Sequence, residues 1–169
     1  MWFIKTILLF FIFFGSASIG IMLSNRYKNR TNELYEIKKG LNYFKSKIEY
    51  TYEPLKEIFL DISNNLNNNI GNIFKIASLN MEKMSAEYAW RNSIELSENC
   101  LNKNDLEIIK SFGKTLGQTD IQGQLNKTNL TLELIERQIE DATKEQNKNE
   151  KLYKTLGFIT GMGLVIILI

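Results

Sequence analysis

The sequence predicts an all-α protein, a cytoplasmic bundle of about six helices whose first and last helices continue into transmembrane spans. Three observations lead to this fold class. Apolar residues recur at spacings of three and four through the middle of the chain, which is typical of amphipathic helices. No run of β-branched residues alternates with period two, so no strand is predicted. Both ends of the 169-residue chain are strongly apolar, which leaves a middle long enough for one small core.

The first element is an apolar run over residues 1–23, whose single charge is Lys5. A run of about twenty residues is long enough to cross the hydrocarbon core of a bilayer. The small residues Ser16, Ala17 and Ser18 would also suit the cleavage site of a signal peptide. Because residues 19–23 are apolar as well, we expect an uncleaved transmembrane helix.

A long amphipathic helix is predicted over residues 25–52. Gly40 lies near its middle, where glycine costs about 1 kcal/mol relative to alanine. We therefore expect another helix to pack closely at Gly40. The apolar stripe of this helix, which includes the core candidates Leu41 and Phe44, consists of Leu34, Ile37, Leu41, Phe44, Ile48 and Tyr52.

Four shorter helices are predicted in the middle of the chain, over residues 54–66, 70–84, 86–99 and 104–116. Pro54 suits the first turn of a helix, and the asparagine-rich residues 64–69 indicate a polar turn. Asn104 and Glu107 have the spacing of a capping box, and Gly117 suits the end of a helix. Trp90 and Phe112 are predicted to fill the core, as large aromatic residues at helical spacing commonly do.

The last helix is predicted from about residue 120 to the end of the chain, after a capping box of Thr119 and Gln122. It begins with a narrow apolar seam and becomes apolar on every side from residue 152, which predicts a second span. Gly157 and Gly161 have the GxxxG spacing that allows close helix packing in lipid. The seam, with Leu132 and Ile135 as core candidates, consists of Ile121, Leu125, Thr128, Leu132, Ile135, Ile139 and Ala142.

These segments give three predicted regions, namely a first span at 1–23, a soluble domain at 24–151 and a second span at 152–169. Basic residues lie on the domain side of both spans, which places the domain in the cytoplasm by the positive-inside rule. Lys28 and residues 151–154 would also suit contact with anionic membrane lipid. The basic residues are Arg26, Lys28 and Arg30 after the first span, and Lys144, Lys148, Lys151 and Lys154 before the second.

The composition argues against an enzyme. Histidine is absent and Cys100 is the single cysteine, so zinc sites and the usual Ser-His or Cys-His pairs lack their residues. No P-loop, GxGxxG or HExxH motif occurs. We expect no catalytic residue, metal, cofactor or small-molecule substrate, and the lack of a basic patch interleaved with aromatic residues argues against nucleic acid.

Motifs along nearly the whole chain resemble the stage III sporulation protein AB family. They are Arg26-Tyr27 after an apolar run, Gly40-Leu41, Ile48-Glu49-Tyr50, Pro54-Leu55, Trp90, the segment 112–120 ending in Asp120, Gln124, the segment 151–157, and Gly161. The resemblance implies a membrane component of the channel between mother cell and forespore, similar to the cytoplasmic domain of the type II secretion inner-membrane platform protein. It also implies a domain in the mother-cell cytoplasm, whose partners are a secretion-type ATPase, stage III sporulation protein AA, and other membrane subunits.

The expected function is therefore that of a non-enzymatic scaffold, with Glu49, Asp120 and Gln124 as candidates for partner binding. Structural roles compete with this assignment. Asp120 would stabilise the start of the last helix through its dipole, and Glu49 would hydrogen-bond a neighbouring tyrosine or lysine. The alternative function is a membrane-anchored helical sensor that signals by dimerisation.

Overall fold

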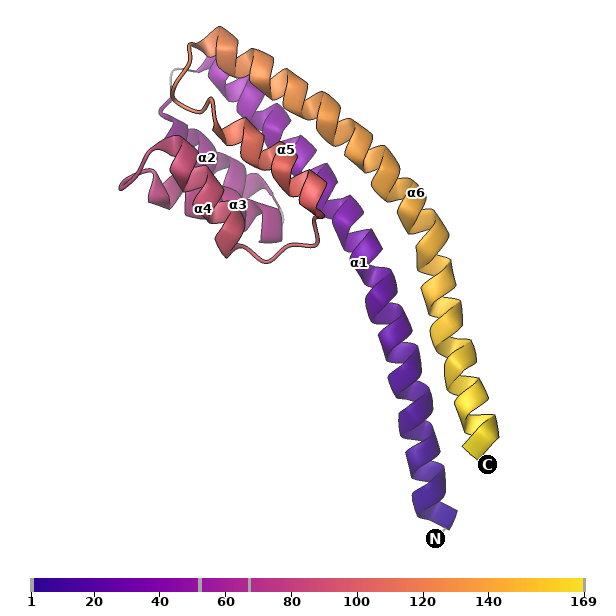
Figure 1. The fold of residues 1–169 in the computed structure, drawn as a ribbon. Coiled ribbons are helices and arrows are strands. Elements are labelled where there is room, and N and C mark those ends of the chain that lie inside the picture. Colours follow the sequence, from indigo (N-terminus) through magenta and orange to yellow (C-terminus); the bar gives the residue numbers. More distant parts are fainter. Residues whose placement is uncertain (1, 52, 67, 169) are drawn as a thin grey trace. The chain divides into compact units, whose positions relative to one another are not determined.

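The computed structural model describes residues 2–51, 53–66 and 68–168, which form six helices and no strand (Figure 1). This confirms the predicted all-α class. The helices are α1 (Trp2–Tyr50), α2 (Leu55–Asn65), α3 (Asn68–Asn80), α4 (Ala86–Leu96), α5 (Lys103–Gly113) and α6 (Ile121–Leu168).

The chain divides into two compact units, and both limits fall inside the long helices α1 and α6. The helix-pair unit comprises Met1–Thr31 and Asp141–Ile169, and the bundle unit comprises Asn32–Glu140. The predicted regions have different limits, at residues 23 and 152, because hydropathy marks where the apolar side chains end. The packing of α1 on α6 continues beyond that point through polar side chains.

The bundle unit is built around five aromatic rings. Helix α2 packs on α3, α3 on α4, and α4 on α5 (Figure 1). Neighbouring ring centroids in this cluster lie between 5.0 and 5.8 Å apart, mostly edge to face. Each such side chain contributes roughly 1.5–3 kcal/mol when fully buried. All five rings are buried, and they belong to Phe44, Phe59, Phe74, Trp90 and Phe112.

The apolar stripe of α1 faces this core. Its members Leu34, Ile37, Leu41, Phe44 and Ile48 are buried, whereas the predicted member Tyr52 lies outside the described residues. Gly40 lies where another helix approaches α1. A Cβ atom added there would be 3.0 Å from Leu66 Cδ1 and from the Phe74 ring, so the glycine makes room for the α2–α3 corner.

The seam of α6 differs from the predicted one at three positions, one of which is Leu125, which is only half-buried. Ile121 is 47% exposed and Leu132 is only half-buried, whereas Ile135 and the unpredicted Thr131 are fully buried. A threonine can face the core because its hydroxyl is satisfied within the helix, and Thr131 Oγ1 donates to Lys127 O at 2.8 Å. The buried face of α6 is therefore rotated toward Thr131 and away from Leu132.

Two predicted helix starts were wrong by one or two residues. The capping box of α5 is formed by Asn102 and Asp105, whose side chains each accept the other's backbone N–H at 2.8 and 3.0 Å. It precedes the predicted box at Asn104. Before α6, Asp120 Oδ1 accepts the N–H of Gly123 at 2.9 Å, so Asp120, not Thr119, caps this helix. Asn102 and Asp120 suit these cap positions because their side-chain oxygens reach the free N–H groups of the first turn.

Two connections between helices differ from the predicted ones. The predicted polar turn over residues 64–69 is shorter in the structure, because α2 continues to Asn65 and α3 begins at Asn68. The prediction that Gly117 ends a helix was wrong, because α5 ends at Gly113 and its C-cap is Lys114. Gly117 lies in the connection between α5 and α6 and has a φ of 70°. Residues with a side chain rarely adopt this backbone conformation, so glycine is required where the chain turns toward α6.

Candidate functional site

The two long helices pack most closely in the helix-pair unit, where glycines face each other. A Cβ atom added to Gly20 would lie 2.6 Å from Tyr153 O and 2.9 Å from Gly157 Cα. One added to Gly161 would lie 3.2 Å from the backbone oxygen of Phe13. Gly157 and Gly161 therefore lie against α1, as small residues do where transmembrane helices meet closely.

One hydrogen bond ties this glycine contact together. Ser16 Oγ donates to Gly157 O at 2.9 Å. This hydrogen bond gives the Ser16 hydroxyl a partner between the two helices. A hydroxyl group buried in an apolar environment without a hydrogen bond costs roughly 2–7 kcal/mol. Ser16, which the sequence suggested as part of a cleavage site, thus has a packing role in the structure.

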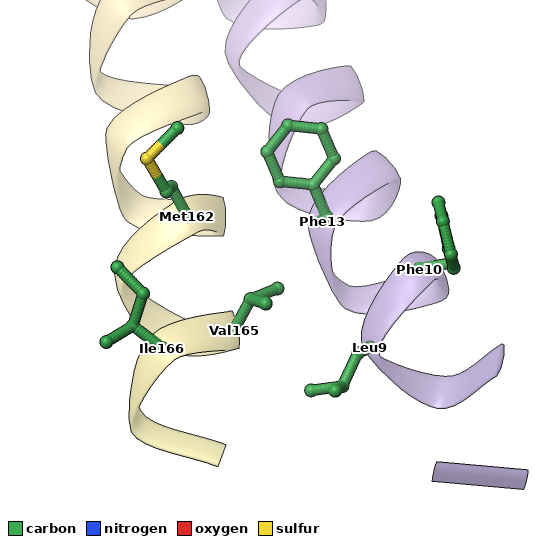
Figure 2. A pocket seen from close by; sticks show the side chains of 6 residues that line it. All are labelled: Leu9, Phe10, Phe13, Met162, Val165 and Ile166. Carbon is green, nitrogen blue, oxygen red and sulfur yellow. The ribbon is translucent and has the colours of Figure 1, made fainter. Parts of the chain in front are cut away.

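Beyond the glycines, the space between the helices is filled by apolar side chains. The rings of Phe13 and Phe158 meet edge to face at 5.3 Å. A cavity of about 300 Å³ follows toward the ends of the chain, and Figure 2 shows Phe13 and Val165 facing it from opposite helices. The cavity is lined by Leu9, Phe10, Phe13, Met162, Val165 and Ile166.

The outer faces of the helix pair are also apolar. Phe3, Phe11, Met22 and Ile167 are between 72% and 85% exposed, which is costly in water. Among the described residues, α1 alone is long and apolar enough to cross a membrane, with a mean hydropathy of 2.3 in its most apolar window. The second span at 152–169 stays a prediction.

Polar side chains continue the pairing of α1 and α6 where the apolar residues end. The rings of Tyr27 and Tyr153 stack at 5.7 Å. The hydrogen bond between these two tyrosines raises the pKa of Tyr27, and burial raises it further. Three residues after Tyr27 on α1, Nη1 of the buried Arg30 lies 2.7 Å from Glu145 Oε2. These contacts extend the rigid pair past the apolar run.

The net charge is divided unevenly between the two units. The helix-pair unit holds eight Lys and Arg residues against three Asp and Glu residues, a net charge of +5. The bundle unit holds thirteen against sixteen, a net charge of −3. Apart from Lys5, which lies near the start of the apolar run, the basic residues of the helix-pair unit form a positive belt next to the other end of that run.

The three predicted partner-binding residues lie at the same end of the bundle unit. Lys38 Nζ and Glu136 Oε1, 2.9 Å apart, set the pairing of α1 with α6, which run in opposite directions (Figure 1). Glu49 follows Lys38 by eleven residues on α1, and Gln124 precedes Glu136 by twelve residues on α6. Because the two helices are antiparallel, both residues lie toward the same end of the bundle unit. Glu49 and Asp120 are exposed, whereas Gln124 is half-buried and donates from Nε2 to Thr119 O at 3.2 Å.

The sequence analysis missed two charged residues that join elements of the bundle unit. Lys47 Nζ lies 2.9 Å from both Asp61 and Glu53, and hydrogen bonds to Asp61 and then Glu53 raise the lysine pKa. The buried Glu33 accepts the N–H of Cys100 at 2.7 Å and the Asn69 side chain at 3.1 Å. The partners of Glu33 are 36 and 67 residues away in the sequence, so no local spacing could reveal them.

Five of the six predicted core residues are buried, and the prediction was wrong for Leu132, which is only half-buried. Leu41, Phe44, Trp90, Phe112 and Ile135 are between 0% and 3% exposed. Trp90 Nε1 also donates to Ile109 O at 2.6 Å, which fixes the ring between α4 and α5. A buried indole needs such a partner for its N–H group.

Comparisons with known proteins agree with this architecture. The family model described as stage III sporulation protein AB matches residues 5–169. Stage III sporulation protein AB of Bacillus subtilis (strain 168) is 30% identical over 162 residues, which are 94% of this chain and 95% of the relative. A solved structure of a stage III sporulation protein AB has a TM-score of 0.64 and 26% identity, and covers 71% of this chain and 98% of its own. Because the family model spans nearly the whole sequence, the chain belongs to the stage III sporulation protein AB family.

Proposed function

We propose that this chain is a non-enzymatic membrane scaffold of the channel between mother cell and forespore. Family membership supports the sporulation context. The observation that carries the scaffold role is the glycine contact at Gly20 and Gly157, which joins two apolar helices into one unit. Such a unit anchors the bundle at two points, and a doubly anchored bundle has fewer ways to rotate than one on a single span.

In this proposal α6 crosses the membrane together with α1. Residues 152–168 of α6 give about 26 Å of helix at 1.5 Å per residue, close to the roughly 30 Å thickness of the hydrocarbon core. The outward side chains Leu156 and Ile159 are 49% and 59% exposed, as residues that face lipid would be. The positive belt then lies on the cytoplasmic side by the positive-inside rule, which supports a bundle in the cytoplasm, and the family resemblance is our reason for proposing the mother cell.

The bundle in turn docks the secretion-type ATPase, stage III sporulation protein AA, and links it to other membrane subunits. This part rests on the sequence resemblance to the secretion platform protein. The end of the bundle unit with Glu49, Asp120 and Gln124 is our candidate contact, because its exposed carboxylates suit a basic surface on the ATPase. The acidic net charge of the bundle unit is consistent with such a partner.

The test is capture of the ATPase by the full chain in neutral detergent. Asp120→Asn is the informative variant, because asparagine caps a helix as well as aspartate but removes the charge. We expect D120N combined with Glu49→Gln to weaken capture severalfold and to lose most of its salt dependence. The matched control is Glu133→Gln combined with Glu140→Gln, which removes two exposed charges further along α6.

Equal capture by both double variants would contradict the contact assigned to this end of the bundle. Failure of the wild-type chain to capture the ATPase would contradict the docking role itself. A chain that is dimeric in detergent, and that stays dimeric when the ATPase is added, would favour the sensor function instead.

A further inference from the structure

A shallow groove lies along α1 where the apolar run gives way to polar residues. Its volume is about 450 Å³, and it is open to the surroundings along one side. The groove is lined by Ser18, Ile21, Met22, Asn25, Arg26 and Asn29. All six belong to the helix-pair unit, and this face of α1 is separate from the glycine face that meets α6.

The lining changes character along the helix axis. Ile21 and Met22 make one part apolar, whereas Asn25, Arg26 and Asn29 supply amide and guanidinium donors to the other. The step from Met22 to Arg26 is about 6 Å at 1.5 Å per residue. The headgroup layer of one leaflet is roughly 5–7 Å thick, so the groove changes polarity over the same depth as a phospholipid.

Arg26 differs from the other arginine of this segment in what it contacts. Arg30 is buried and paired with Glu145. Arg26 is exposed, and within the described part of the chain it forms no ion pair. A guanidinium group binds phosphate oxygens through two parallel hydrogen bonds, and the side-chain amides of Asn25 and Asn29 add further donors beside it.

We propose that this groove binds one anionic phospholipid, with its phosphate on Arg26, Asn25 and Asn29 and an acyl chain along Ile21 and Met22. Seven basic and three acidic residues of the helix-pair unit lie beyond the apolar run on the side of the groove, and this net charge of +4 favours anionic over zwitterionic lipid. The inference rests on the proposed membrane anchoring of α1. It goes beyond a general attraction of basic residues to the membrane, because it assigns a single site with a defined lining.

The test uses the full chain reconstituted in phosphatidylcholine bilayers with added phosphatidylglycerol, then extracted into neutral detergent for native mass spectrometry. In neutral detergent the charged bilayer surface is gone, so only lipid held in a site is retained. The variants are Arg26→Gln and Lys28→Gln. Each removes one positive charge from the same turn of α1, but Lys28 does not line the groove.

We expect the wild type and K28Q to retain one phosphatidylglycerol and R26Q to bind it about tenfold more weakly, as the loss of a charge-assisted contact implies. Equal losses in R26Q and K28Q, retention of phosphatidylcholine instead, or no retention by the wild type would each overturn the lipid site. If the wild type is a dimer and R26Q dissociates it, a second copy of the chain occupies the groove, and this result would also overturn the lipid site.

Insertion is measured first, by resistance of the reconstituted chain to alkaline extraction. If the wild type resists extraction but retains no lipid, the site is refuted and the anchoring stands. If the wild type is extracted, the proposed anchoring itself is refuted.

Discussion

Substitution of Gly20 provides the sharpest test of the helix pair. An alanine Cβ at this position would lie 2.9 Å from Gly157 Cα, whereas carbon atoms pack at roughly 3.5–4.0 Å. The obstructing atoms are backbone, so no rotamer change relieves the contact. The two helices must therefore separate by about 0.6–1.1 Å at this level to admit one methyl group.

A disulfide between introduced cysteines can measure this separation. A Cβ at position 161 would lie 3.3 Å from Ser16 Cβ, and disulfides need a Cβ–Cβ distance of roughly 3.5–4.5 Å. In a Cys100→Ser background, S16C with G161C should form a disulfide readily upon mild oxidation. The separation imposed by Gly20→Ala raises the distance to about 3.9–4.4 Å, which keeps it in the disulfide range.

A larger side chain should prevent the disulfide. Ordinary helix pairs lie about 8–10 Å apart depending on the side chains between them, so Gly20→Ile should open the pair by a further 1–2 Å, to a Cβ–Cβ distance above roughly 5 Å. The matched control is Gly15→Ile, because a Cβ at Gly15 meets nothing within 4 Å. Rapid disulfide formation in G20I, or equal loss in G15I, would refute the close contact of α1 with α6.

Three further predictions concern the stability of the bundle unit. For each, thermal unfolding of the full chain is measured by circular dichroism. Gly113→Ala should destabilise it by about 1–3 kcal/mol through overpacking, because the new Cβ would lie 2.5 Å from Trp90 Cδ1. Glu33→Gln should cost about 1–3 kcal/mol, because glutamine has one acceptor oxygen and leaves a buried donor such as the Cys100 N–H unpaired. The hydrogen bond from Lys110 on α5 lowers the pKa of Glu95 below its usual 4.5. The stability difference between the wild type and Glu95→Gln should therefore shrink as the pH falls below 4.5.

Each of these predictions has its own control. Gly163→Ala makes the same change as G113A where a Cβ meets nothing within 4 Å, so it should not lower the unfolding temperature. Glu107→Gln neutralises an exposed glutamate and should leave stability unchanged, in contrast to E33Q. A wild-type advantage over Glu95→Gln that persists at low pH, or that is unaffected by salt, would contradict an exposed ion pair.

The periodicity of the sequence was enough to predict where the helices lie and which residues fill the core. The stripe from Leu34 to Ile48 is buried as a unit, because burial of one face requires apolar residues at helical spacing. Helix starts were less predictable. Asn102 with Asp105 and Asn104 with Glu107 offer the same type of cap two residues apart, and the choice depends on Asp105, which is fully buried in the bundle.

The candidate site was predictable only in part. The spacing of Gly157 and Gly161 indicated a close contact, but Gly20 and Ser16 as its partners could not be found, because a contact between residues 141 positions apart leaves no local pattern. The groove beside Arg26 was equally hidden, since its lining depends on which face of α1 the glycines occupy.

By itself, therefore, the sequence determined the helical class, the apolar ends and the basic belt, because these follow from residue type and spacing along one chain. Tertiary structure decided which glycines meet, that Thr131 and not Leu132 faces the core, and that Glu33 joins segments far apart in the sequence. The physical reason is that side-chain periodicity fixes a face within each helix, whereas rotation and register between helices are fixed only when their surfaces fit together.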